Sequence, residues 1–552
     1  PAADFNNLFF KGAETDFGRQ LDPMLVRADN GVSGWSEWER VNVNTDPVGT
    51  DSLATAAVWG GVVPGDTLEI TYTFIDGNVD HPAPFYYRCH PDFPIPGPPE
   101  IPADAECDQA VDDFPLNQPQ REAIRRLLGD YENYANLKFT EVAYLPGAAD
   151  PVADGSNAGM VFGAAKLDDG VGAWAYFPNG GNGHATYAGD VWYNTDSFDP
   201  NDEATFGNVG YGTGFDFTTI HEVGHTMGFK HSFDNAGGGR VLSIFNDFQY
   251  NTVMSYTADN IHNPFPAYPE SPSSPMLFDV ERLQEVYGAN ADFNPGNTHY
   301  GNFFVGSEPN FFTNDEQHQS TLWDGGGVDT LNYTNHVADE TIDLREGTWS
   351  SVNGLQQTLR IAYDAQIENA RGGSGNDNIR GNEIANLLFG NDGDDVLRGG
   401  GDNDVMRPGA GDDTVIWSLG DGRDYIREEG NGGIDVVEFY DPSGNLDSLE
   451  DDFLVVREES FTPGSDGSAF NLRINFTPDK GPGQGTVTIV DQSDEESSVE
   501  LMRMFGLFGG KIGVDIDLHS LAEQATNIPT RFSVTEELGQ NGGFLVTPFL
   551  GS

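Results

Sequence analysis

Alternating apolar and polar residues predict a β-strand at residues 68–74, where Leu-Glu-Ile-Thr-Tyr-Thr-Phe places every second side chain on one face. Apolar residues spaced three and four apart then predict a helix after Asn117, with Pro119 in its first turn. Shorter strands are predicted at 137–142, 160–162, 172–177 and 191–193. This order of elements predicts a twisted sheet backed by helices.

A second helix is predicted within Thr218–His231, which reads TTIHEVGHTMGFKH. His221 and His225 are four residues apart, so both imidazoles lie on one helix face and can bind one Zn²⁺. Glu222 projects beside them, where it can act as a general base on a metal-bound water. The opposite face is apolar and suits a core; it contains Ile220, Val223, Gly224 and Met227.

The residues after this helix complete a candidate zinc site. Gly228 can take the left-handed conformation that ends a helix, so the chain can turn back and His231 can be a third ligand. Three protein ligands leave a fourth position for water, as in catalytic zinc sites. Downstream, Met254 fits a Met-turn that forms an apolar floor beneath the ligands, and Tyr256 can reach the zinc or a developing oxyanion. A helix at 275–287 closes this region.

A repeat module follows, because residues 372–416 contain five nine-residue units in one phase. The pattern GGxGxDxUx is that of a parallel β-roll that binds Ca²⁺. Glycine turns expose carbonyl oxygens, and the sixth-position carboxylates complete an all-oxygen shell. The second unit has Asn386 instead of Asp, which predicts a gap in the row of ions. The predicted calcium positions are Asp377, Asp395, Asp404, Asp413, Gly373, Gly375, Gly393, Gly400 and Gly411, with Asp324 and Asp329 as weaker candidates in an outlying partial turn.

Taken together, the patterns predict an α+β metzincin catalytic domain, made of a twisted sheet and the active-site helix, followed by an all-β parallel β-roll or β-sandwich domain. We divide the chain into four parts. They are an N-terminal extension or pro-segment remnant at 1–50, a zinc metalloprotease domain at 51–315 with a Pro-rich insertion at 79–113, a calcium-binding β-roll at 316–440, and a β-rich C-terminal domain at 441–552.

Composition narrows the choice of partners. With 27 basic and 88 acidic residues, the formal net charge is −61, which argues against nucleic acid and anionic membranes and favours cations. No run of 18 or more apolar residues predicts a membrane span. Cys89 and Cys107 are the two cysteines. They could form a disulfide in an oxidising compartment or be two unrelated thiols.

The zinc motif, the Met-turn and the nonapeptide repeats together resemble the serralysin family of secreted bacterial zinc metalloproteases, over roughly residues 51–440. The resemblance implies one catalytic zinc held by His221, His225 and His231, and several structural calcium ions. It implies that Glu222 is the general base and Tyr256 a reversible fifth ligand. The strand containing Trp174, Ala175 and Tyr176 would pair with the substrate backbone. The resemblance further implies extracellular export through type I secretion machinery that reads an uncleaved C-terminal signal.

The sequence therefore predicts a secreted, monomeric zinc endopeptidase that acts on protein substrates. Two alternatives remain. One is a calcium-dependent adhesive protein with a vestigial zinc domain, against which the intact Glu222 and Tyr256 weigh. The other is a protease that acts on a single partner, with the insertion and the C-terminal region as recognition modules.

Overall fold

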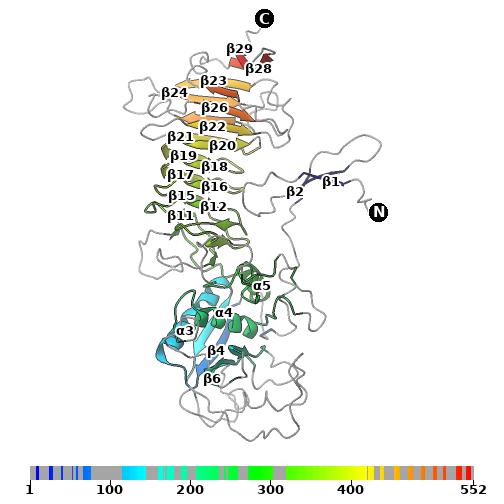
Figure 1. The fold of residues 1–552 in the computed structure, drawn as a ribbon, viewed down its shortest axis with the longest axis vertical. Coiled ribbons are helices and arrows are strands. Elements are labelled where there is room, and N and C mark those ends of the chain that lie inside the picture. Colours follow the sequence, from blue (N-terminus) through cyan, green and yellow to red (C-terminus); the bar gives the residue numbers. More distant parts are fainter. Residues whose placement is uncertain are drawn as a thin grey trace.

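A mixed α/β domain lies at one end of an elongated molecule, and a stack of short strands extends away from it (Figure 1). In the computed structural model, the described residues are mainly 66–75, 115–144, most of 159–195, 207–234, 246–258, 272–301 and 319–440 with two short gaps. Outside these ranges, the structure describes strands at both ends of the chain but not the segments that connect them.

A five-stranded sheet forms the first domain, in the order β5-β4-β6-β8-β7. Its first four strands are parallel, whereas β7 pairs antiparallel with β8 and forms one edge. The predicted sheet is therefore present. Its strands are β4 (Leu68–Phe74), β5 (Leu137–Glu141), β6 (Met160–Ala165), β7 (Ala173–Ala175) and β8 (Val191–Asn194).

Helices α3 (Gln118–Tyr134), α4 (Gly214–Thr226) and α5 (Leu277–Tyr287) pack in this domain. The predicted cap of α3 is confirmed: the Asn117 side chain accepts from the Gln120 amide at 3.0 Å, and the Gln120 side chain accepts from the Asn117 amide at 2.9 Å. Because these reciprocal bonds satisfy amides that have no partner within the helix, they fix where α3 begins.

Several predicted boundaries differ from the structure: the strand expected at 160–162 continues to Ala165, and the helix expected at 275–287 begins at Leu277. The strand expected at 172–177 is only three residues long, Ala173–Ala175. Backbone hydrogen bonds continue for one more residue, since the Tyr176 amide donates to the Asp190 carbonyl at 3.0 Å, and the Phe177 ring then lies edge-on to His225 with ring centroids 5.7 Å apart. Local periodicity does not predict this contact between Phe177 and His225.

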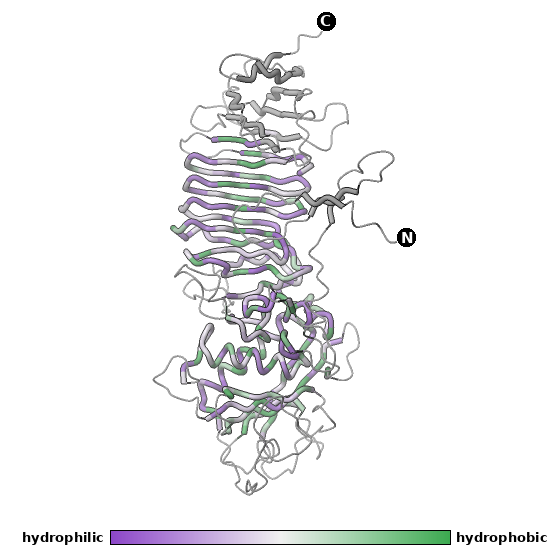
Figure 2. Tube along the Cα trace, turned by 45° about the vertical axis from the view of Figure 1, so that its right-hand side comes forward, coloured by the Kyte–Doolittle hydropathy of each residue, from purple (hydrophilic) through white to green (hydrophobic). Residues whose placement is uncertain are grey.

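The repeat region is a roll of two parallel sheets. One contains β15 (Asn369–Arg371), β17 (Leu387–Asp392), β19 (Val405–Ala410) and β21 (Arg423–Arg427). The other contains β12 (Thr341–Asp343), β16 (Asn378–Arg380), β18 (Val396–Arg398), β20 (Thr414–Ser418) and β22 (Val436–Tyr440). Neighbouring strands are two repeat units apart, so Ile379 lies beside Leu397. Each of these strands buries an apolar side chain between the sheets, for example Leu388, Leu397 and Ile426, and Figure 2 shows an apolar centre with polar turns.

Both sheets continue past residue 440. Strand β25 (Thr486–Val490) pairs parallel with β21, and β26 (Leu501–Phe505) pairs parallel with β22. Antiparallel strands then extend them: β23 (Phe453–Glu459), β24 (Phe470–Asn475), β27 (Val514–Asp517), β28 (Thr530–Glu537) and β29 (Gly543–Pro548). The strands expected in this part of the chain are present, and they are hydrogen-bonded to the roll.

At the other end of the chain, β1 (Leu8–Lys11), β2 (Met24–Ala28) and β3 (Glu39–Val41) form an antiparallel sheet. The insertion at 79–113, with Cys89 and Cys107, lies outside the described residues. Among the helices that the structure describes, none is long and apolar enough to cross a membrane.

Candidate metal centre and active site

Helix α4 places the first two candidate ligands and then ends sharply. The Thr213 side chain accepts from the Asp216 amide at its start. At its end Gly228 has φ of 92°, and the Phe229 amide donates to the Gly224 carbonyl at 3.0 Å. This left-handed glycine reverses the chain, as predicted, and brings His231 back over the helix.

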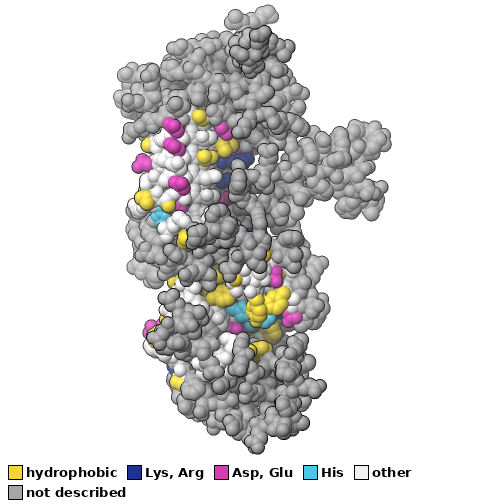
Figure 3. All heavy atoms as spheres, in the orientation of Figure 1, with side chains coloured by type: hydrophobic (Ala, Val, Ile, Leu, Met, Phe, Trp, Pro, Cys, Tyr) yellow, Lys and Arg dark blue, Asp and Glu magenta, His cyan; other side chains and the backbone are white. Residues whose placement is uncertain are grey.

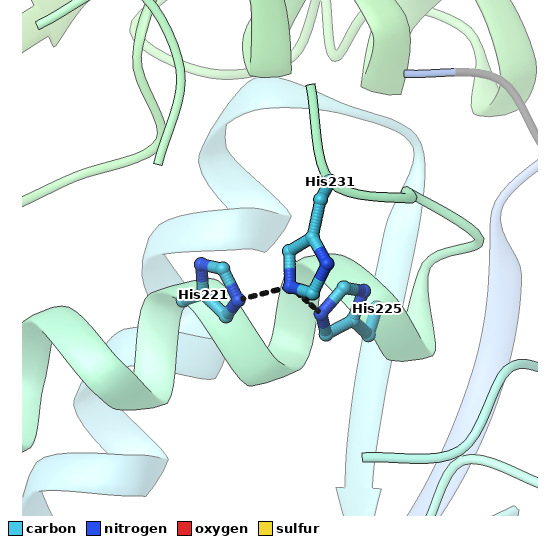
Figure 4. A group of neighbouring side chains, drawn as sticks. All are labelled: His221, His225 and His231. Atoms are coloured by element: carbon cyan, nitrogen blue, oxygen red, sulfur yellow. Dashed lines mark hydrogen bonds between the residues drawn. The ribbon is translucent and has the colours of Figure 1, made fainter. Parts of the chain in front are cut away.

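The three histidines converge through their Nε2 atoms (Figure 4). The Nε2 of His231 lies 3.3 Å from that of His221 and 3.1 Å from that of His225. The Nδ1 of His221 lies 2.6 Å from the Val253 carbonyl oxygen, and the Nδ1 of His225 lies 2.6 Å from that of Phe229. Since a carbonyl only accepts, both Nδ1 atoms carry protons and both Nε2 lone pairs face the cluster.

This donor set fits a zinc ion. Nitrogens about 2.0–2.1 Å from one tetrahedral Zn²⁺ lie about 3.3 Å from each other, close to the two measured separations. Nδ1–H bonds to carbonyls are the contacts that orient zinc-binding histidines. Burial lowers the pKa of His221 and of His231 to about 4, and that of His225 well below its usual value. All three imidazoles are therefore neutral near pH 7, as metal ligands must be.

The Met-turn lies beneath these ligands. Met254 is fully buried, and its Sδ lies 2.7 Å from where a Cβ on Gly224 would be. A larger residue at 224 would therefore displace the Met254 side chain from its position against the helix. The same turn supplies the Val253 carbonyl that orients His221, so it supports the ligands both sterically and by hydrogen bonding.

Asp279, on α5, is hydrogen-bonded to this turn. Its buried carboxylate accepts from the Thr252 hydroxyl at 2.6 Å, the Val253 amide at 2.8 Å and the Met276 amide at 2.9 Å. Burial raises its pKa to about 6. Sequence reasoning missed Asp279; the available signal was a carboxylate in the first turn of a helix whose neighbours are apolar.

Glu222 and Tyr256 lie near the histidine cluster, one on helix α4 beside His221 and the other in contact with His231. Glu222 is buried, and burial raises its pKa to about 8. The Tyr256 hydroxyl lies 2.8 Å from His231 Nε2, and its side chain is 64% exposed. Phe233, also missed by sequence reasoning, stacks on His231 with ring centroids 5.1 Å apart. Figure 3 shows histidines at the surface, bordered by hydrophobic side chains.

The predicted substrate-binding residues lie on the edge strand of the sheet. Trp174 is opposite Trp192 of β8, and among the strands that the structure describes β7 is at the edge of this sheet. Trp174 is partly exposed, whereas Ala175 and Tyr176 are buried. An edge strand of this kind can pair with an extended peptide.

In the roll, the predicted calcium carboxylates form two ladders with an 18-residue spacing. Asp377 donates its amide to Asp395, and Asp395 donates its amide to Asp413, at 2.7 and 2.8 Å. In the second ladder the Asn386 amide donates to Asp404 at 2.8 Å. In each accepting carboxylate one oxygen takes this bond. The second oxygens of Asp395, Asp404 and Asp413 are buried and form no hydrogen bond. Buried carboxylate oxygens that accept no hydrogen bond fit Ca²⁺, which prefers oxygen ligands.

Two further ladder members, Asp424 and Asp435, were missed. Their carboxylates accept from the amides of Asp404 and Asp413 at 2.9 and 3.0 Å. The separations are 20 and 22 residues rather than 18, so small insertions hide them from a nine-residue repeat search. The signal that could have found them is an Asp after glycine-rich turns, as in Gly-Asp-Gly-Arg-Asp.

Glycines let the turns stack. Gly393 has φ of 117° and Gly411 φ of 146°, where side chains are strained. A Cβ on Gly411 would overlap the Gly393 carbonyl oxygen, and one on Gly393 would overlap that of Gly375. Gly400 and Gly373 meet carbonyl oxygens of neighbouring turns in the same way. Substitution would separate the turns whose carbonyls are the candidate ligands.

The weaker candidates Asp324 and Asp329 are also brought together. Both are buried, and burial together with the nearby charges of Asp324 and Glu368 raises the pKa of Asp329 to about 7. One oxygen of Asp329 forms no hydrogen bond.

Asn386, which replaces an aspartate in the second ladder, differs from the ladder carboxylates. Its side-chain nitrogen donates to the Glu368 carbonyl at 2.9 Å.

Family comparisons agree with this geometry. Residues 156–285 match the model for the reprolysin-like metallopeptidase family M12B, and residues 289–529 match that for the C-terminal domain of peptidase M10 serralysin. The chain thus joins a metallopeptidase domain to a second domain of mainly parallel strands. The second domain is of serralysin type, so the predicted resemblance to the serralysins is confirmed.

Individual relatives of this chain are named as serralysins or metallopeptidases. Serralysin of Proteus mirabilis is 33% identical over 280 residues, which are 49% of this chain and 55% of that protein. Metallopeptidase AprA of Pseudomonas marginalis is 34% identical over 288 residues, 49% of this chain and 55% of that protein. Serralysin A of Dickeya chrysanthemi is 33% identical over 268 residues, with 48% and 53% covered. The chain spans about half the length of the curated relatives it matches.

Proposed function

We propose that this protein is a secreted zinc endopeptidase that hydrolyses peptide bonds in proteins and is stabilised by calcium in its roll. The observation that carries the proposal is the convergence of three neutral imidazoles beside a buried carboxylate, in a domain of metallopeptidase type. His221, His225 and His231 would hold the zinc. When bound, zinc supplies a Lewis acid that lowers the pKa of a bound water and polarises a carbonyl.

The chain's own residues supply the rest of the reaction. An extended substrate pairs with the outer edge of β7 at Trp174, which carries its scissile carbonyl past α4. Glu222 accepts the proton of the attacking water and delivers it to the leaving amine. Although burial raises its pKa, a cation held by the adjacent histidines favours the carboxylate, as a general base requires.

The Tyr256 hydroxyl donates a hydrogen bond to the developing oxyanion. Partial burial and the charge of the nearby Glu222 raise its pKa to about 12, so it keeps its proton near pH 7. We expect Tyr256→Phe to lower kcat about 10²-fold with KM and zinc content little changed, because one oxyanion donor is lost. Steady-state kinetics on a fluorogenic peptide measure this. Tyr425→Phe, at an exposed site on the roll, is the matched control. If Tyr256→Phe left kcat unchanged, Tyr256 would not be the oxyanion donor.

We also propose that the protein is exported through type I secretion machinery and that it acts as a monomer. Calcium would replace protons at the buried ladder carboxylates, so the roll would fold where calcium is abundant.

The test is casein hydrolysis with calcium in excess, before and after treatment with phenanthroline. We expect hydrolysis to fall to the background rate and to return when zinc is added. Far-ultraviolet circular dichroism must stay unchanged, which excludes unfolding as the cause. A protein that is inert with zinc bound and calcium present would instead favour the adhesive alternative, and one that cuts only a single substrate would favour the single-partner alternative.

A further inference from the structure

The metallopeptidase domain and the roll meet at a small sheet of β10 (Ser320–Leu322), β14 (Leu359–Ile361) and β13 (Trp349–Ser350). Strand β10 is hydrogen-bonded to the first domain. The Tyr134 hydroxyl donates to the Thr321 carbonyl at 2.7 Å, and the Thr321 amide donates to the Ser274 hydroxyl at 3.1 Å. This small sheet is therefore held against the domain that contains the histidines.

Arg360, at the middle of β14, reaches across this contact. Its Nη1 donates to the Asn251 side-chain oxygen at 2.7 Å, and its Nε donates to the Gly347 carbonyl at 2.7 Å. Its guanidinium lies 5.0 Å from the centre of the Trp349 ring. Because the guanidinium is planar and held by two hydrogen bonds and a ring, it fixes where the Asn251 side chain lies.

Asn251 stands directly before the Met-turn. Its side-chain nitrogen donates to the Asn246 carbonyl at 3.0 Å, and its own carbonyl accepts from the Phe278 amide at 3.1 Å. Two residues later, the Val253 carbonyl accepts from His221 Nδ1 at 2.6 Å. Arg360 is thus connected to a zinc-ligand candidate through one short, hydrogen-bonded turn.

We infer that Arg360 is a positioning residue for the zinc site: from the C-terminal module it holds the Asn251 end of the Met-turn and keeps the Val253 carbonyl aligned on His221. The inference rests on the proposed function. Partners that orient metal ligands typically change metal affinity or activity 10–100-fold when removed. Arg360 acts one step farther away, so the lower end, about tenfold, is expected.

The test compares Arg360→Met, which keeps the stem but loses the donors, with Arg360→Lys, which keeps a charge and a donor. Zinc affinity is measured by chelator competition, and ligand geometry by the visible spectrum of the cobalt(II)-substituted protein. We expect Arg360→Met to weaken zinc binding about tenfold and shift the cobalt spectrum, and Arg360→Lys to restore part of both. Adding Asn251→Ala to Arg360→Met should cause little further loss, because the two residues share one contact.

Arg345→Met is the matched control, because Arg345 bonds Asp343 within the roll. It should leave zinc affinity and the cobalt spectrum unchanged. If Arg360→Met lowers the melting temperature but leaves both readouts as in wild type, the inference is wrong and Arg360 only joins the domains. A wild-type protein that neither binds zinc nor hydrolyses casein would instead overturn the proposed function itself.

Discussion

Glu222→Gln should abolish nearly all peptide hydrolysis while leaving the zinc site intact. The amide has almost the same shape as the carboxylate but cannot accept a proton, so we expect kcat to fall about 10²–10⁴-fold. Because Glu222 lies on α4 between the histidines rather than among their converging nitrogens, zinc content should stay unchanged. Initial rates on casein and metal analysis of the same samples measure both quantities.

The matched control is Glu285→Gln, an exposed carboxylate on α5 that pairs with Arg282. It should retain wild-type rates. A Glu222→Gln protein that keeps more than a tenth of the wild-type kcat would show that another group accepts the proton. Loss of zinc from this variant would mean that Glu222 acts on the metal site rather than on the water.

Calcium removal should reverse how the stability of the roll depends on pH. Burial, together with the like charges of neighbouring carboxylates, raises the pKa of Asp395 and of Asp404 to about 8. Without calcium, the folded roll therefore binds more protons than the unfolded chain. Its stability is greatest below the ordinary carboxyl pKa, near 4, and is lost as pH rises through about 8. Each such group lowers the free energy of unfolding by up to about 1.4 kcal/mol per pH unit within that window.

With calcium bound, the opposite dependence is expected. The ion needs the ionised carboxylates, so acidification competes with it and stability rises with pH. Thermal unfolding followed by circular dichroism at pH 5 and pH 8, in calcium and in a calcium chelator, measures the four states. The same pH dependence with and without calcium would refute the calcium ladder.

Asp395→Asn supplies an internal check, since Asn386 already occupies the equivalent ladder position with an amide. In chelator this variant should be more stable than wild type at pH 8, because one buried charge is gone. In calcium it should bind the ion more weakly. If the variant and the wild type were equally stable in all conditions, Asp395 would not titrate in the folded roll.

Sequence by itself determined the features that depend on residues close together in the chain. Helical spacing placed His221 and His225 on one face, Gly228 provided the reversal that returns His231, and the nine-residue phase paired the roll strands. Each of these follows from local geometry: four residues in a helix, one positive φ, or two repeat units in a roll.

Only the tertiary structure decided which distant groups support these features. Asp279 and Arg360 have no local pattern that marks them, because each acts on the Met-turn from an element far along the chain. Asp424 and Asp435 join the ladders only because two sheets carry them into register across insertions of two and four residues. Hydrogen bonds over such separations depend on packing, which periodicity in one sequence does not encode.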